Sequence, residues 1–116
     1  MWKIILACAV LATAGPAWAH AFLDHSSPAV GATVPAPKAV SIWFTEAVEP
    51  AFSRIEVADA AGNRVDAGGT HIDAADHALL HIAVKPLSAG TYKVTWHVVS
   101  VDTHHTQGDF TFTVAP

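Results

Sequence analysis

Apolar and polar residues follow one pattern at the start of the chain and a different one beyond it. Residues 4–14 form an almost continuous apolar run, which Lys3 precedes and a Gly-Pro pair ends. Residues 17–19 then read Ala-Trp-Ala, the small-x-small sequence that signal peptidase recognises. The apolar run is shorter than the roughly 20 residues of a membrane-spanning helix. We therefore expect residues 1–19 to be a cleaved secretory signal peptide and residues 20–116 to be one folded domain.

Beyond residue 20, apolar and polar residues alternate and show little helical periodicity. Alternation with a period of two is typical of half-buried strands, and clusters of turn residues separate the alternating segments. There are about seven such segments, which predicts an all-β fold of the antiparallel sandwich type. Gly68 and Gly69 are expected to interrupt the chain between two of them. The expected strands are residues 21–23, 39–45, 52–57, 64–65, 78–84, 91–100 and 109–114.

Four aromatic residues within these strands are expected to lie in the core: Trp43, Trp96, Phe110 and Phe112. The single Cys and the single Met of the chain both belong to the expected signal peptide. The exported domain would therefore have no disulfide, no thiolate ligand and no thioether ligand, and its stability would come from packing alone.

The charge balance is mildly acidic. The chain has six Lys and Arg against ten Asp and Glu, which gives a formal net charge of −4. This balance disfavours nucleic acids and anionic membranes as partners, because both are bound through basic faces. The eight histidines are more informative, since imidazole is the commonest metal ligand and also titrates near neutral pH.

Cleavage after Ala19 would make His20 the first residue of the exported protein. A histidine at a free N-terminus offers two nitrogen donors to one metal ion, the α-amine and the ring Nδ1, which together close a six-membered chelate. The reference pKa values of these groups are about 7.7–8.0 and about 6.5, so both lose a proton readily near neutrality. The alternative is that the cleavage site happens to precede a histidine with no such role.

Asp102 and His104 lie between the last two expected strands. In an extended backbone residues i and i+2 point the same way, so both side chains are expected on one side, opposite Thr103. With His20 they would supply three nitrogens and one oxygen, a set that suits tetragonal Cu(II). Zinc also accepts these donors, although structural zinc sites usually include Cys. Alternatively, Asp102 caps a turn and the adjacent histidines are solvated.

Several separated motifs follow one another in a fixed order along the chain. They are His20-Ala21-x-Leu23, Ser27-Pro28-x-x-Gly31, Phe44-Thr45-Glu46-x-Val48-Glu49-Pro50, Val94-x-Trp96, Val99-Ser100-x-Asp102-x-His104 and Gly108-x-Phe110-x-Phe112-x-Val114. In this order they resemble the CopC family of periplasmic copper-resistance proteins, over the whole of residues 20–116.

The resemblance implies a seven-stranded Greek-key sandwich of immunoglobulin-like type that binds Cu(II). It implies that His20 contributes its amine and its ring, that Asp102 contributes a carboxylate and that His104 contributes a second imidazole. Some family members place a Glu beside the metal, and Glu46 occupies that position here. We expect Glu46 to be a weak axial ligand or a neighbour of the ligands.

Three departures from the family pattern bear on the site. The family usually has Gly where this chain has Thr103, and Pro where it has His105. Thr103 removes a flexible backbone position, and His105 competes with His104 as a ligand, although strand alternation favours His104. The chain also lacks the Met-rich segment that some members use for Cu(I), which favours a protein for Cu(II) alone.

We expect a monomeric periplasmic carrier or buffer for Cu(II) in copper homeostasis or resistance, and not an enzyme. Its partners would be the copper ion and a CopD-like inner-membrane copper transporter. The alternative function is a copper-dependent oxidase or monooxygenase, which would use His20 in a histidine-brace site. A third possibility is a metal-free adhesion module. Among the other histidines, His25 is a further candidate near the site, and His71, His77 and His81 are candidates for a weak secondary metal site.

Overall fold

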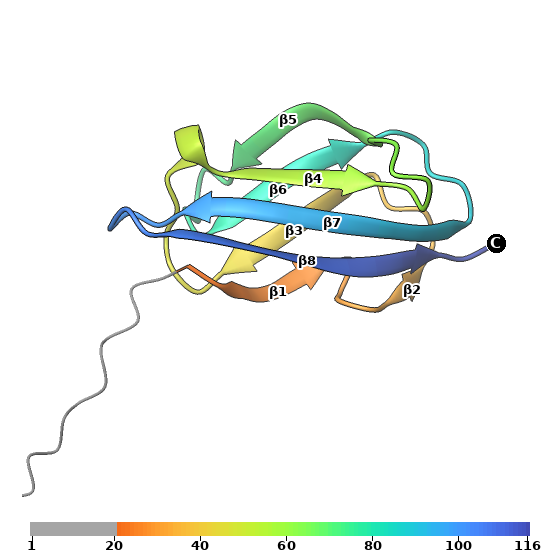
Figure 1. Cartoon of the computed structure of the whole chain (residues 1–116), viewed down its shortest axis with the longest axis horizontal. Coiled ribbons are helices and arrows are strands. Elements are labelled where there is room, and N and C mark those ends of the chain that lie inside the picture. Colours follow the sequence, from red (N-terminus) through yellow and green to blue (C-terminus); the bar gives the residue numbers. More distant parts are fainter. Residues whose placement is uncertain (1–20) are drawn as a thin grey trace, which may run out of the picture.

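The computed structural model describes residues 21–116, so the expected signal peptide and His20 lie outside the described residues. The chain forms two stacked four-stranded sheets (Figure 1). Sheet I has the order β1-β3-β6-β5 and sheet II the order β2-β8-β7-β4. Sheet I contains β1 (Leu23–Ser27), β3 (Ala39–Phe44), β6 (Leu79–Val84) and β5 (Asp66–Ile72). Sheet II contains β2 (Thr33–Val34), β8 (His105–Val114), β7 (Gly90–Val99) and β4 (Arg54–Ala58).

This architecture confirms the predicted all-β sandwich. Seven of the strands have five or more residues, and β2, which has two, is the one parallel neighbour of β8. The remaining strand pairs are antiparallel. A short 3₁₀ helix, η1 (Pro50–Phe52), precedes β4. No helix among residues 21–116 is long and apolar enough to cross a membrane.

The inward-facing residues of both sheets form one core. In β3 the alternate residues Val40, Ile42 and Phe44 are buried, and Trp96, Phe110 and Phe112 are buried as predicted. The prediction for Trp43 is wrong. Because Ile42 and Phe44 set the inward phase of β3, Trp43 points outward, where its ring stacks on His25 with centroids 4.4 Å apart.

Several strands differ from the prediction. β1 extends to Ser27, β2 was not predicted, and β5 at Asp66–Ile72 replaces the strand expected at residues 64–65. Gly68 and Gly69 do not interrupt the chain but lie inside β5, where the pairing with β6 shifts register between Ala67 and Thr70. Both glycines have φ of +76°, which a bulge in a strand accommodates readily when no Cβ is present. The last strand begins at His105 rather than at residue 109, because β7 and β8 pair along their full ten residues.

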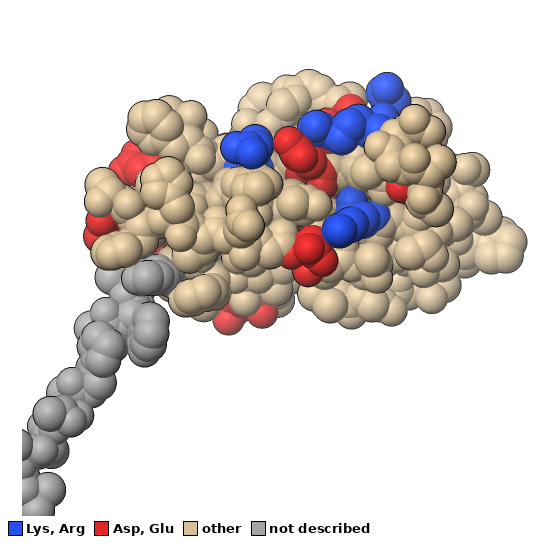
Figure 2. Space-filling view, in the orientation of Figure 1, with Lys and Arg blue, Asp and Glu red and all other residues tan. Residues whose placement is uncertain are grey.

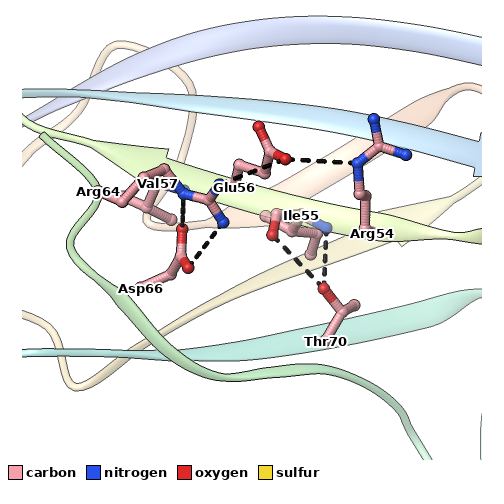
Figure 3. Close-up of polar contacts among 7 residues, drawn as sticks. All are labelled: Arg54, Ile55, Glu56, Val57, Arg64, Asp66 and Thr70. Carbon is pink, nitrogen blue, oxygen red and sulfur yellow. Dashed lines mark hydrogen bonds and ion pairs between the residues drawn. The ribbon is translucent and has the colours of Figure 1, made fainter. Parts of the chain in front are cut away.

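The free edge of β4 is closed by side chains from β5 (Figure 3). The backbone N–H of Ile55 donates to Thr70 Oγ1 at 2.9 Å, and that of Val57 donates to Asp66 Oδ2 at 2.7 Å. Arg64 Nε and Nη2 donate to the same carboxylate at 2.7 and 2.9 Å. Unpaired strand edges promote aggregation, so these bonds both protect the edge and join the two sheets.

Candidate metal centre

The candidate ligands Asp102 and His104 lie in the tight turn that joins β7 to β8. The turn is held by its own backbone, since Ser100 N–H donates to the carbonyl of His104 at 3.0 Å and Thr103 N–H donates to the carbonyl of Ser100 at 2.8 Å. Ser100 is fully buried and its hydroxyl donates a short hydrogen bond to Asp102 Oδ1. The turn therefore fixes the carboxylate of Asp102 against the end of the sandwich.

The structure brings Asp102 and His104 together, but not for the reason that the sequence suggested. Asp102 Oδ2 lies 3.1 Å from His104 Nδ1. The backbone between them is not extended, because Thr103 has φ of +72° and is the one non-glycine residue with positive φ among those described. A β-branched residue is rarely found in this region, so the turn holds a conformation that Gly would adopt more easily.

The environment of Asp102 keeps its carboxylate ionised. The hydrogen bond from Ser100 is the largest influence and lowers the pKa of Asp102. Partial desolvation opposes this shift, and His104 reinforces it through a hydrogen bond and through its charge when protonated. An ionised carboxylate beside an imidazole offers one oxygen and one nitrogen donor to a cation. About one third of the Asp102 side chain and half of the His104 side chain are exposed, so an ion can reach them.

The start of the described chain is fastened next to this turn. Ala21 is fully buried, and its carbonyl accepts a hydrogen bond from the Thr106 hydroxyl at the beginning of β8. Phe22 and Thr45 exchange two further bonds, from Phe22 N–H to Thr45 Oγ1 at 3.0 Å and from Thr45 N–H to the carbonyl of Phe22 at 2.8 Å. Ala21 is therefore bonded to Thr106, which follows His104 by two residues in the chain, while His20 itself lies outside the described residues.

Glu46 belongs to the segment that follows β3 and runs beside the same turn. Val101 N–H donates to the carbonyl of Ala47 at 3.2 Å, and Val48 forms a β-bridge with Ser100. The Glu46 side chain is exposed. Within residues 21–116, no three His, Cys, Asp or Glu side chains are grouped closely enough to hold a metal, so the described part of the centre is the pair Asp102 and His104.

His105 opens β8 and is paired in register with Val99. It lines a groove of about 500 Å³ on the outer surface of sheet II, together with Phe52, Arg54 and His97. Asp102 is paired with His104, so His104 remains the predicted ligand of the two.

The secondary metal site expected around His71, His77 and His81 is not formed among the described residues. Both ring nitrogens of His81 are already used, Nδ1 with Ser41 Oγ at 2.7 Å and Nε2 with Asp73 Oδ1 at 3.0 Å. His25 is likewise occupied, because it stacks on Trp43 and its Nδ1 lies 2.6 Å from Asp24.

Sequence reasoning missed the residues that hold the candidate ligands in place. Ser100 orients Asp102, and Thr45 and Thr106 fasten the start of the described chain. Ser is a common turn residue, so Ser100 carried a weak signal. Thr45 and Thr106 carried none, because their partners lie 23 and 85 residues away in the sequence.

Comparison with known proteins identifies the family of the chain. Residues 23–115 match the model of the CopC domain. The chain is 39% identical over 99 residues to protein YobA of Escherichia coli strain K12, covering 84% of this chain and 80% of YobA. It is 38% identical over 117 residues to copper resistance protein C of Xanthomonas campestris pv. juglandis, covering 96% of this chain and 91% of that protein. It is also 33% identical over 115 residues to the copper transport protein CutJ of Bacillus subtilis, covering 97% of this chain but 21% of CutJ.

Solved structures show the same similarity. CopC from Methylosinus trichosporium OB3b superposes with a TM-score of 0.78 at 37% identity, covering 84% of this chain and 95% of that chain. PcoC, a methionine-rich copper resistance protein from Escherichia coli, superposes with a TM-score of 0.75 at 33% identity, covering 83% of this chain and 99% of that chain. The fold, the motifs and these relatives together show that the chain belongs to the CopC family, a family of copper-related proteins.

Proposed function

We propose that the protein is exported and that it binds one Cu(II) ion as a carrier or buffer. The ligands would be the α-amine and ring of His20, the carboxylate of Asp102 and the ring of His104. The observation that supports this most directly is the pairing of Asp102 with His104 at 3.1 Å, beside the point where Ala21 is fastened to Thr106. In this proposal His20 directly precedes Ala21, so a single peptide unit separates His20 from the residue that is fastened beside the pair.

The donor set favours the oxidised ion. Two imidazoles, one amine and one carboxylate are borderline and hard donors, which suit Cu(II), while Cu(I) prefers thiolate or thioether sulfur. The chain contains one Met and one Cys, both before residue 9. A chain cleaved after residue 19 therefore has neither sulfur ligand, in contrast to PcoC, which is described as methionine-rich.

The proposed setting is the periplasm, reached through cleavage of the signal peptide, with the protein acting as a monomer. Glu46 lies on the segment beside the ligand turn and would be a weak axial ligand or would attract the ion. The proposed recipient or donor of copper is a CopD-like inner-membrane copper transporter. Support comes from CutJ, a copper transport protein. A region that makes up about a fifth of CutJ is similar to nearly all of this chain. Because Asp102 would complete the ligand set, we propose binding and delivery rather than catalysis.

The proposal is tested by electron paramagnetic resonance of residues 20–116 with one equivalent of Cu(II). We expect a tetragonal spectrum with three nitrogen donors. A variant with one Gly inserted before His20 moves the amine away from the ring, and we expect it to lose the high-affinity site. The matched control is His71→Ala, which removes an exposed histidine of β5, on the sheet that does not carry the turn. Tight binding of one ion by the Gly-extended variant would refute the proposed ligand set.

A further inference from the structure

The charges of the molecule are divided unevenly between its two ends. We call the end that carries the β7–β8 turn, η1 and residues 45–49 the metal end. Five carboxylates lie in its loops, because Val48 N–H and Phe44 N–H are bonded to the carbonyls of His77 and Ala78 and so bring the 73–78 loop to this end. These carboxylates belong to Glu46, Glu49, Asp73, Asp76 and Asp102.

Four of the five Lys and Arg residues within 21–116 lie toward the opposite end, in the loops there and in the nearer half of β7. They are Lys38, Arg64, Lys85 and Lys93. Arg54 is the exception, and its Nε lies 3.4 Å from Glu56. On the face shown in Figure 2, acidic side chains stand without Lys or Arg at the left end, and the basic side chains begin toward the middle. The negative charge of the domain is therefore concentrated at the metal end.

The same end carries most of the exposed large apolar side chains. Of the four that are described, Phe22, Phe52 and Val101 lie at the metal end, and Val30 lies at the opposite end beside the last part of β8. Phe52 is 70% exposed on η1 and Val101 is 56% exposed in the β7–β8 turn. Phe52 also forms one wall of the groove on sheet II. Exposed apolar side chains that gather in one place commonly mark an interaction surface.

We infer that the metal end is a docking surface, and that its occupant is the membrane transporter proposed above, which presents a face combining Lys or Arg with apolar side chains. This inference rests on the proposed function. Phe52 and Val101 would contact the apolar part of that face, and Glu46 and Glu49 would attract its basic part. Complementary charge steers such encounters and fixes their orientation. The surface surrounds Asp102 and His104, so docking there places the bound ion next to its recipient.

Charge also argues against other occupants of this end. A second copy would place two acidic ends against each other, and like charges in contact oppose association. An anionic bilayer would be repelled for the same reason. In CutJ a covalent connection keeps the similar region close to the rest of the protein, which raises its effective concentration.

The test uses photocrosslinking in cells of the source organism that export the protein with benzoylphenylalanine at position 52. The matched control places the same residue at position 30, because Val30 is 58% exposed at the opposite end. We expect an adduct from position 52 to an integral membrane copper transporter, at least about tenfold more abundant than that from position 30. Mass spectrometry should locate the adduct in a segment containing Lys or Arg next to apolar residues. Adding Glu49→Lys should reduce the yield several-fold, while Asp109→Lys, the same charge change midway along β8, should not.

Equal yields at the two positions, or adducts mainly with lipid, with a second copy or with an acidic partner, would overturn the docking surface. If Glu49→Lys left the crosslinking yield unchanged, the role given to charge would be overturned. Cu(II) binding by each purified variant is measured in parallel by electron paramagnetic resonance. If the protein binds one Cu(II) normally but crosslinks equally from both positions, the docking surface is refuted and the proposed function stands. If the purified protein fails to bind Cu(II), the proposed function is refuted.

Discussion

Asp66 in β5 and Asp102 in the β7–β8 turn carry the same carboxylate group, but the first stabilises the fold and the second is a candidate metal ligand. Both have a pKa below the ordinary Asp value. Asp66 is 11% exposed, and its oxygens accept bonds from Arg64 and from the N–H of Val57 (Figure 3). Asp102 is 33% exposed and faces His104, whose imidazole is a candidate metal ligand. We infer from this difference that a carboxylate with a fixed cation stabilises the fold, and that one beside an exposed imidazole can accept an exchangeable cation.

The largest effect is expected for Asp102→Asn on copper binding. Outer-sphere partners of metal ligands typically contribute about 10–100-fold in affinity, so loss of a direct carboxylate donor should lower Cu(II) affinity by more than about 100-fold. Competition titration against a chelator of known affinity measures this change. Asp66→Asn is the control and should leave the affinity within about twofold. If both variants bound copper equally well, the distinction between the two carboxylates would fail.

For the free energy of unfolding, the larger effect is expected from substitution of Asp66 and the smaller from substitution of Asp102. Asp66→Ala leaves the N–H of Val57 and the guanidinium of Arg64 without their acceptor, and an unsatisfied buried group costs about 1–3 kcal/mol. We therefore expect the free energy of unfolding in urea to fall by about 2 kcal/mol. Asp102→Asn should change it much less, since its carboxylate is more exposed. A larger loss of stability in Asp102→Asn than in Asp66→Ala would contradict the structural role assigned to Asp66.

A smaller effect is expected when the support of Asp102 is removed and the carboxylate is kept. Ser100→Ala deletes the hydroxyl that orients the carboxylate, and such supporting groups contribute about 10-fold or more to metal affinity. Thr70→Val is the matched change at the β4 edge, where the hydroxyl accepts from Ile55 N–H. It should cost about 1 kcal/mol of stability with no effect on copper affinity. Unchanged affinity in Ser100→Ala would show that the turn alone positions Asp102.

The smallest effects concern acid titration. Burial raises the pKa of Asp66, but the bonds from Arg64 and Val57 outweigh it and the pKa is lowered. A depressed carboxyl pKa contributes stability that is present above the unfolded value of about 3.9 and is lost as the pH falls through the folded value. We expect stability to decrease below about pH 4, and Asp66→Asn to flatten this decrease. Carboxyl carbon NMR should show Asp66 and Asp102 both titrating below pH 3.9, with Ser100→Ala raising the pKa of Asp102 alone.

The sequence predicted more of the fold than of the site's construction. Strand alternation located six of the eight described strands to within a few residues, because the phase of buried and exposed positions is local. It missed β2 and predicted a break within β5. It placed Trp43 in the core, since alternation shows that a strand has two faces but not which face is inward. It predicted an extended backbone for residues 102–104, because the positive φ of Thr103 arises from the closure of a hairpin between two ten-residue strands and not from the preference of threonine.

The sequence by itself determined the class of fold and the kind of donors that the chain offers to a metal. Both follow from residue type and short-range spacing, which set hydrophobic phase and ligand chemistry. Tertiary structure decided that Asp102 meets His104, that Ala21 is fastened beside them, and that Asp66 is occupied by Arg64. It also placed five of the ten carboxylates in the loops of the metal end and most of the Lys and Arg side chains toward the other end. These outcomes depend on strand register and turn closure, which arise from contacts between residues far apart in the chain.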